Sequence, residues 1–305
     1  MYHYFSALLF HIFSLTLLLS TAFCHAYAVE NTLNIPQARS SFDISHSYHK
    51  ELLLKALHTN QENEQVTLIE SALPMSQGRA IAELKNKSLD IYWLGTSNFL
   101  EKELIPIKVP TTRGLIGFRK FIIHKDSLKN FTKVKSINEL KKFSACQGTH
   151  WPDTEILRSA SLTVITTPIY EDLFKMLNAK RCDYFPRGYH DITTELTLRK
   201  NLYPDLISLD NILLHYPFAV YFFTHKNNKK LADKIELGLQ RMAQNGEIEA
   251  LMKKHPLTAN TFPLSAEQHD VLLELNNSLL PSNTNFLDST YWILPRDFDQ
   301  STSHH

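Results

Sequence analysis

Two loops of this chain combine glycine with hydroxyl-bearing residues directly after a β-prone segment, a setting that suits the binding of a small anionic group. In open α/β sheets such loops lie at the carboxyl ends of strands, where backbone amides and the next helix N-terminus can hold a carboxylate. The simpler alternatives are a helix cap in the first loop and a core position for the tryptophan of the second. We expect ligand contacts from Gly95, Thr96 and Ser97 in the first loop and from Gly148, Thr149, His150 and Trp151 in the second.

A cationic side chain follows a third β-prone segment. Arg187 stands after Phe185 and Pro186, and a guanidinium prefers carboxylate, phosphate or sulfate partners. Asp191 either offers a ligand a negative partner or neutralises Arg187. Arg119 interrupts an apolar run, where a charge is normally paired, so we expect for it either a structural salt bridge or a ligand contact.

The sequence contains none of the common catalytic motifs: no Gly-x-Ser-x-Gly elbow, no Gly-x-x-x-x-Gly-Lys-Ser/Thr loop, no His-Glu-x-x-His and no Rossmann glycine fingerprint. We therefore expect a binding protein and not an enzyme. The alternative is an exported hydrolase or lyase that uses cleft carboxylates such as Asp153, Glu155 or Asp191. His46 and His49 are three residues apart but lack companions at metal-binding spacing, so we expect neither a metal nor a cofactor.

The composition favours a dissolved small molecule as the binding partner. With 305 residues, of which 43% are hydrophobic, the chain can bury a substantial core and form two compact units. Lys and Arg number 32 against 31 Asp and Glu, which leaves no basic surface of the kind that nucleic-acid or polybasic membrane binding requires. We expect a monomer that binds no nucleic acid.

The N-terminal segment is typical of export to the periplasm. The apolar run 7–19 (ALLFHIFSLTLLL) is too short for a comfortable transmembrane helix, and Ala-Tyr-Ala at 26–28 is a signal-peptidase pattern. We predict a signal peptide over 1–28; because no Lys or Arg precedes the apolar run, an uncleaved anchor is the alternative. The cysteines left after cleavage, Cys146 and Cys182, either form one disulfide or lie as two buried thiols.

The order of strand and helix patterns divides the mature chain into two α/β lobes. The two kinds of pattern alternate, which indicates parallel βαβ units. Two long β-prone runs, 115–123 and 218–223, can pass from one lobe to the other. We predict a discontinuous lobe 1, formed by 29–115 and by 220–305 with a C-terminal tail that wraps it, and a lobe 2 formed by 116–219.

Three segments of the chain resemble the type II periplasmic solute-binding proteins, in particular the receptors of polar amino-acid ABC importers. They are 221–255 (YFFTHKNNKKLADKIELGLQRMAQNGEIEALMKKH), 136–157 (SINELKKFSACQGTHWPDTEIL) and 170–188 (YEDLFKMLNAKRCDYFPRG). The combination of GLIGFR, QGTHWPDT and DYFPRG is similar to a subgroup of receptor-like proteins. The resemblance implies two lobes, each with a mixed, mostly parallel sheet flanked by helices, two hinge crossings, and a ligand cleft that closes by hinge bending.

Two positions depart from the pattern of that family. Related receptors often place an acidic group for the ligand's ammonium where this chain has Arg187 and Gly188. Relatives carry an arginine seven residues after the first-lobe glycine, where this chain has Lys102, which supplies a charge but no bidentate fork. The resemblance therefore implies capture of a small polar or anionic solute, amino-acid-like or another carboxylate, on behalf of an ABC permease or a membrane sensor, with Lys102 and Arg119 as further candidate contacts.

Overall fold

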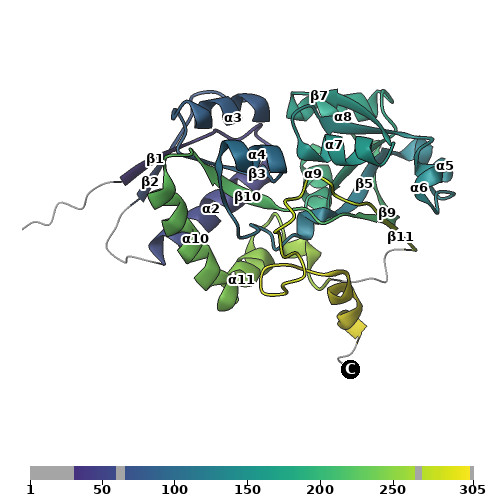
Figure 1. Cartoon of the computed structure of the whole chain (residues 1–305). Helices are drawn as coiled ribbons and strands as arrows, with labels where there is room; N and C mark the ends of the chain where they lie inside the picture. Colours follow the sequence, from purple (N-terminus) through teal and green to yellow (C-terminus); the bar gives the residue numbers. More distant parts are fainter. Residues whose placement is uncertain (1–30, 60–65, 265–269, 303–305) are drawn as a thin grey trace, which may run out of the picture.

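Alternating strands and helices build two α/β lobes that lie side by side (Figure 1). The computed structural model describes residues 31–59, 66–264 and 270–302. The predicted signal peptide, residues 1–28, lies outside these ranges. Within them, every helix is too short or too polar to cross a membrane.

The first lobe is built on short strands from both halves of the chain. These are β1 (Asn31–Ile35), β2 (Val66–Glu70), β3 (Ile91–Gly95), β4 (Ile105–Ile107) and β10 (Val220–Thr224). β1 and β2 pair in parallel, and a 2.9 Å hydrogen bond from the Asp90 amide to the Asn34 carbonyl joins β1 to the residue before β3. β10 lies between β3 and β4 and runs antiparallel to both, because it enters from the other lobe.

Helices cover this first sheet. They are α2 (Ile44–His58), α3 (Gln77–Lys85), α4 (Asn98–Glu103), α10 (Lys229–Gln244) and α11 (Glu247–Lys254). The buried face of α10 carries Ile235, Leu239 and Met242 at helical spacing. A Cβ on Gly238 would lie 2.0 Å from the carbonyl oxygen of Ala56 in α2, so only glycine lets the two helices approach this closely.

The second lobe holds a six-stranded sheet in the order β11-β9-β5-β8-β6-β7. Its strands are β5 (Phe118–His124), β6 (Ser144–Gly148), β7 (Thr163–Thr167), β8 (Tyr184–Gly188), β9 (Leu206–His215) and β11 (Val271–Glu274). Its helices are η2 (Lys125–Ser127), α5 (Leu128–Phe131), α6 (Ile137–Leu140), α7 (Pro152–Ser159), α8 (Tyr170–Asn178) and α9 (Ile192–Arg199). β7, β6 and β8 are parallel, whereas β5 is antiparallel to both of its neighbours. The predicted α/β class, with mixed sheets flanked by helices, is confirmed.

Two adjacent segments cross between the lobes. The outward crossing contains η1 (Leu115–Gly117), and the return crossing is 216–219. The Tyr216 amide donates to the Gly117 carbonyl at 3.1 Å, and a Cβ on Gly117 would lie 2.5 Å from the Tyr216 carbonyl oxygen. The crossings are shorter than the predicted runs 115–123 and 218–223, because most of those residues form β5 and β10 inside the lobes.

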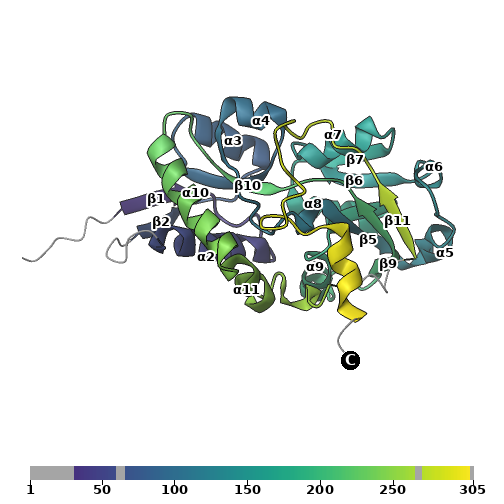
Figure 2. The same cartoon turned by 60° about the horizontal axis from the view of Figure 1, so that its bottom comes forward.

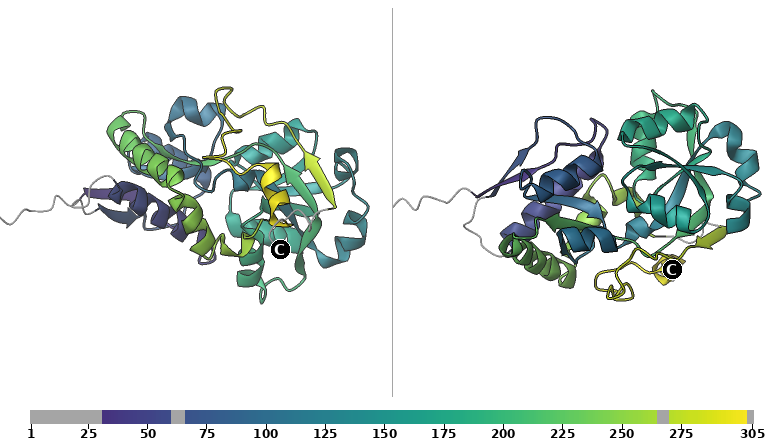
Figure 3. Two further views of the ribbon diagram at one scale, coloured as in Figure 1. Left: turned by 90° about the horizontal axis from the view of Figure 1, so that it is seen from below. Right: turned by 45° about the horizontal axis from the view of Figure 1, so that its top comes forward.

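The C-terminal segment does not wrap the first lobe alone, as we expected from the sequence. After η3 (Ala259–Thr261), β11 pairs in parallel with β9 and becomes the edge strand of the second lobe. Its alternating burial explains the position, because Val271 and Leu273 face the core while Leu272 and Glu274 face solvent. Assigning all of 220–305 to the first lobe was therefore wrong for β11. The chain then returns to the junction between the lobes and ends in η4 (Pro295–Thr302), drawn in yellow (Figures 2 and 3).

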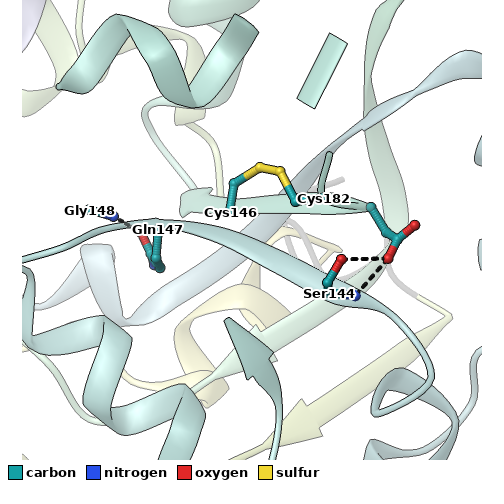
Figure 4. Close-up of a disulfide and its surroundings, with 6 residues drawn as sticks. Ser144, Cys146, Gln147, Gly148 and Cys182 are labelled. Atoms are coloured by element: carbon teal, nitrogen blue, oxygen red, sulfur yellow. Dashed lines mark hydrogen bonds between the residues drawn. A yellow bond between two sulfur atoms is a disulfide. The ribbon is translucent and has the colours of Figure 1, made fainter. Parts of the chain in front are cut away.

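A disulfide joins Cys146 and Cys182, which resolves the alternative that the sequence left open. Cys146 lies in β6 and Cys182 stands just before β8, the neighbouring parallel strand, so their Cα atoms are 5.6 Å apart (Figure 4). Next to the disulfide, the Asp183 carboxylate accepts hydrogen bonds of 2.7 Å from both the amide and the hydroxyl of Ser144. The two strands are thus joined covalently and by polar contacts at the end where they begin.

Candidate ligand-binding site between the lobes

A cavity of about 90 Å³ lies between the two lobes and beside both crossings. The first lobe contributes side chains such as His49 and Thr112, and the second lobe contributes Arg119, Arg187 and His190. Most of the lining side chains are buried, so a molecule held here would lose part of its hydration. We call this space the inner chamber.

A second space of about 140 Å³, the outer chamber, adjoins the inner one. The two chambers share Arg39, Gln77 and Trp151 as walls. Direct contacts between the lobes lie beside it: the Gln77 side chain donates to the His150 carbonyl at 3.0 Å, and the guanidinium of Arg39 lies 4.1 Å from the ring centroid of Tyr170. The lobes therefore touch around the chambers in this structure.

Arg187 is held in place by two carboxylates of its own lobe. Its Nε and Nη2 atoms bind the Glu195 carboxylate at 2.8 and 2.6 Å, and Nη2 lies 3.2 Å from Asp191. All three side chains are buried. Burial alone would lower the pKa of Arg187, but the charges of Glu195 and Asp191 outweigh it and raise the pKa well above the ordinary value. Arg187 thus lines the cavity as a fully compensated cation.

A second ion pair forms part of the wall of the inner chamber. Arg119 at the start of β5 binds Asp153 in α7, and the Tyr216 hydroxyl donates to the same carboxylate at 2.7 Å. The Arg119 side chain is 2% exposed and the Asp153 side chain is 7% exposed. Arg119 therefore forms the structural salt bridge that the sequence suggested, and it also lines the inner chamber.

Arg39 supplies the third guanidinium from the segment between β1 and α2. Its Nε and Nη2 atoms bind the two oxygens of Asp43 at 2.6 and 2.7 Å. Burial opposes both charges, but the pairing outweighs it, raising the pKa of Arg39 and lowering the pKa of Asp43. Three guanidinium groups around the chambers thus face four carboxylates, those of Asp43, Asp153, Asp191 and Glu195.

Three buried polar atoms on the lining residues have no hydrogen-bond partner among the described residues. They are Thr112 Oγ1, Arg119 Nε and His190 Nδ1. An unpaired polar atom costs about 1–3 kcal/mol when it is buried, and in native proteins such atoms usually mark a bound water, ion or ligand. These atoms belong to residues of both lobes that line the inner chamber.

Comparison with known proteins bears on the fold. No protein-family model and no curated protein matches the chain. Among solved structures, it is similar to an arginine-specific periplasmic binding protein of Salmonella typhimurium, with 12% identity, 74% of this chain and 99% of that chain covered, and a TM-score of 0.53. It is similar to an amino acid ABC transporter substrate-binding protein of Streptococcus pneumoniae bound to L-arginine, with 17% identity, 70% and 84% covered, and a TM-score of 0.53. A histidine kinase sensor domain gives 14% identity, 74% and 96% covered, and a TM-score of 0.53. The chain has the type II periplasmic binding protein fold.

Most of the predicted contact residues lie at the cleft of this periplasmic binding protein fold. In the second lobe, Gly148, Thr149 and His150 line the outer chamber, and Trp151 lines both chambers. Gly95, Arg119 and Arg187 line the inner chamber. Residues of both predicted loops therefore line the chambers, but the first loop contributes only Gly95.

The remaining predicted residues, Thr96, Ser97 and Lys102, line neither chamber. The Thr96 hydroxyl donates to Glu101 at 2.6 Å, and the Ser97 hydroxyl caps α4 by accepting from the Leu100 amide. The following amide, of Asn98, donates to the Leu279 carbonyl of the C-terminal segment at 2.8 Å. This loop acts as a helix cap, the simpler of the two alternatives, and its polar groups already have partners.

Sequence reasoning missed several residues of the inner chamber. Arg39 follows β1, so the rule that selects loops at the carboxyl ends of strands could have found it. His190 stands two residues after the end of β8 and is indicated by the same rule. His49 and Trp93 gave no usable signal, because a histidine in a helix and a tryptophan in a strand are indistinguishable from core residues until the lobes are placed together.

The carboxylates considered for catalysis are engaged in pairs. Asp153 binds Arg119, Asp191 lies beside Arg187, and Glu155 forms an exposed pair with Arg158 on α7, outside both chambers. In the part of the chain that the structure describes, no three His, Cys, Asp or Glu side chains come together as a metal site. The solved structures named above are binding proteins and a sensor domain.

His49 makes the stability of the first lobe dependent on pH. Its ring stacks on Trp93 with centroids 5.0 Å apart, Nδ1 lies 2.7 Å from the Ser45 carbonyl and Nε2 lies 3.1 Å from the Thr111 hydroxyl. Burial lowers its pKa from 6.5 to about 3. The unfolded chain therefore takes up a proton as the pH falls below 6.5 while the folded protein does not, so stability is lost in that window.

We expect the free energy of unfolding to fall from pH 6.5 toward pH 4 by up to about 1.4 kcal/mol per pH unit through this one group. In His49→Gln the fall should be shallower, which denaturant unfolding at pH 7, 6, 5 and 4 measures. The exposed His58→Gln variant serves as control and should keep the wild-type slope. Equal slopes in all three proteins would contradict the assignment.

Proposed function

We propose that this protein is an exported solute-binding protein that captures a small polar, amino-acid-like solute in the inner chamber by closing its two lobes. The observation that carries the proposal is a cavity lined by both lobes, on whose lining residues the buried atoms Thr112 Oγ1, Arg119 Nε and His190 Nδ1 have no partner within the described ranges of the chain. A solute that bonds groups of both lobes favours the closed over the open arrangement, which couples binding to hinge closure.

The charges around the chamber favour a solute that carries both signs or no net charge. Each of the three guanidinium groups has its own carboxylate partner, as described above. Their positive charges are therefore already balanced and do not favour an anionic solute. Asp191 is buried, yet His190 and Arg187 keep its pKa below the ordinary value, so it remains an acceptor for a cationic group. An amino-acid-like zwitterion fits these groups better than a dicarboxylate or an oxyanion.

The partner of the closed form is an ABC permease or a membrane sensor. Both kinds of system occur among the similar structures, which include importer receptors and a histidine kinase sensor domain. An oxidising compartment such as the periplasm suits the Cys146–Cys182 disulfide. Export predicts that protein purified from the periplasm begins at Val29, and N-terminal sequencing tests this; a chain that begins at Met1 would favour the uncleaved anchor.

A thermal-shift screen of amino acids, short peptides, dicarboxylates and oxyanions tests the proposed class of solute. A true solute raises the melting temperature with a dependence on its concentration. Mass spectrometry of the recovered solute separates the receptor from the alternative enzyme, because a receptor returns it unchanged. A screen in which oxyanions bind and zwitterions do not would overturn the charge argument, and turnover of the bound compound would favour a hydrolase or lyase.

We expect Thr112→Val to leave the stability of the protein unchanged or higher and to weaken the binding of the solute. The substitution removes a buried hydroxyl that has no partner among the described residues, so the free energy of unfolding should stay the same or rise by up to about 1 kcal/mol. The solute loses one hydrogen bond, and its Kd should increase about fivefold, corresponding to about 1 kcal/mol. Isothermal titration calorimetry measures the Kd. The matched control is Thr197→Val on the exposed side of α9, which should leave the Kd unchanged.

A further inference from the structure

The C-terminal segment follows the return crossing from one lobe to the other. β11 pairs with β9 up to the register pair Glu274 and His215. The Leu275 amide then donates to the His215 carbonyl at 2.9 Å, and the Asn277 side chain donates to the Pro217 carbonyl at 2.8 Å.

On the first lobe, Leu279 continues this path. Its carbonyl accepts from the Asn98 amide at 2.8 Å, close to where the Thr96 amide donates to the Ala219 carbonyl at 2.9 Å. The segment 275–279 therefore runs beside 215–219 over the whole length of the crossing.

The span between the hydrogen bonds of Leu275 and Leu279 is short and can lengthen only slightly. Leu275 is bonded to the second lobe and Leu279 to the first, and four residues reach at most about 14 Å even when fully extended. The middle of the span is fixed as well, because Asn277 both holds the crossing through Pro217 and accepts from the Leu279 amide at 3.0 Å. Rotation of the lobes must therefore change this segment together with the crossing itself.

The same segment later reaches the outward crossing. The Ile293 amide donates to the Arg113 carbonyl at 2.7 Å. Trp292 packs against Gly114, whose φ is +70° and on which a Cβ would lie 2.2 Å from the indole. Arg113 also has a positive φ, 49°. The indole thus covers Gly114, next to the positive-φ residue Arg113, at the place where the outward crossing begins.

Buried apolar side chains hold the segment at both ends. Val271, Leu273 and Leu275 belong to the core of the second lobe. Phe298, beyond the second attachment, lies against Phe118 with ring centroids 4.7 Å apart. Hydrophobic contacts therefore hold the segment on both sides of its hydrogen bonds to the crossings. These contacts do not depend on whether a solute is present.

We propose that residues 271–298 form a hinge clamp that stiffens both crossings and limits how far the two lobes open. Hinge motion needs a few residues that can change their φ and ψ angles, and here both sets of candidate residues, 113–117 and 216–219, have a third segment bonded to them. The proposal concerns the free protein and holds whether or not the solute is the one proposed above.

Lengthening the short span tests the clamp without removing any of its contacts. About eight Gly and Ser residues are inserted between Asn276 and Asn277, which adds up to about 26 Å of reach. Fluorophores attached through non-natural amino acids at the exposed positions Asn86, after α3, and Glu155, in α7, report the distance between the lobes by single-molecule energy transfer. We expect a broader distribution and a mean distance longer by on the order of 5–10 Å, within the reach added by the insertion.

The matched control places the same insertion after Asn285. This site is exposed and is flanked by Asn283, which contacts Lys108 of the first lobe, and by Ser289, which contacts Arg113 at the first-lobe end of the outward crossing. The control should keep the wild-type distribution. Equal distributions for all three proteins, or an equal change in both insertion variants, would overturn the proposal.

Hydrogen exchange on the unaltered protein provides a second test if the insertion variant does not fold. The Asn98 amide is protected by the Leu279 carbonyl, so a clamp that stays in place predicts exchange as slow as that of the amides in β10. If the Asn98 amide exchanges about ten times faster than the amides of β10, or faster still, the segment detaches in the native state. That result would exclude the clamp.

Discussion

Replacing Arg187 with methionine lowers the free energy of unfolding by about 3–5 kcal/mol, because it leaves the buried carboxylates of Glu195 and Asp191 without their cation. Glu195 makes two hydrogen bonds with the guanidinium, and Asp191 makes a third contact. The aromatic ring of Trp151 lies 5.3 Å from the guanidinium carbon and also loses a partner. Urea unfolding followed by circular dichroism measures the change.

The control for this prediction is Arg158→Met, which removes an exposed ion pair with Glu155 on α7. Exposed pairs contribute about 0–1 kcal/mol, so the two variants differ several-fold in effect. Adding Glu195→Gln to Arg187→Met should recover part of the loss, because one uncompensated charge is removed. A loss for Arg187→Met no larger than that for Arg158→Met would show that water reaches the carboxylates. Because of this structural role, Thr112 and not Arg187 is the residue for testing solute contact.

Removing the disulfide is the second large change. Cys146 and Cys182 are separated by 36 positions in the sequence. Closing a loop of this length lowers the conformational entropy of the unfolded chain, which increases the free energy of unfolding by about 4 kcal/mol. We expect the Cys146→Ala, Cys182→Ala double variant to lose about that amount in urea unfolding under oxidising conditions. The loss should concern the second lobe, where β6 and β8 are joined.

Dithiothreitol provides the control for the disulfide. It should destabilise the wild-type protein by a similar amount and leave the double variant unchanged, because the variant has no disulfide in its second lobe to reduce. A wild-type protein whose unfolding does not respond to the reductant, although thiol labelling of the unfolded chain shows that the disulfide is open, would contradict the prediction.

The fold class and the second-lobe loop were accessible from the sequence because both depend on local patterns. Gly148 to Trp151 come after a strand and before a helix, and chain order alone places them at a strand end. Arg187 was identified by the same rule. Its pairing with Glu195 was not, because neither a strand nor a helix pattern shows which charged side chain faces which.

For the first loop the sequence left a ligand contact and a helix cap as alternatives, and Thr96 and Ser97 bond Glu101 and Leu100 nearby in α4. The contact of the loop with the C-terminal segment could not be predicted. Nothing near Asn98 indicates that its amide is taken by Leu279, nor that β11 would join the sheet of the second lobe. The alternation of buried and exposed residues in Val271–Glu274 was visible, but an edge strand of four residues does not reveal which sheet it completes. Pairing between distant segments is set by the shape of the assembled lobes.

The position of β11 has a consequence for biosynthesis. β9 is made before the helices α10 and α11, and its outer edge stays unpaired until residues 271–274 have been translated. An open strand edge is a template for pairing with other chains. A polypeptide that folds before residues 271–274 are available therefore exposes one row of free backbone groups, and chaperones that hold the chain unfolded until then would protect that edge from aggregation.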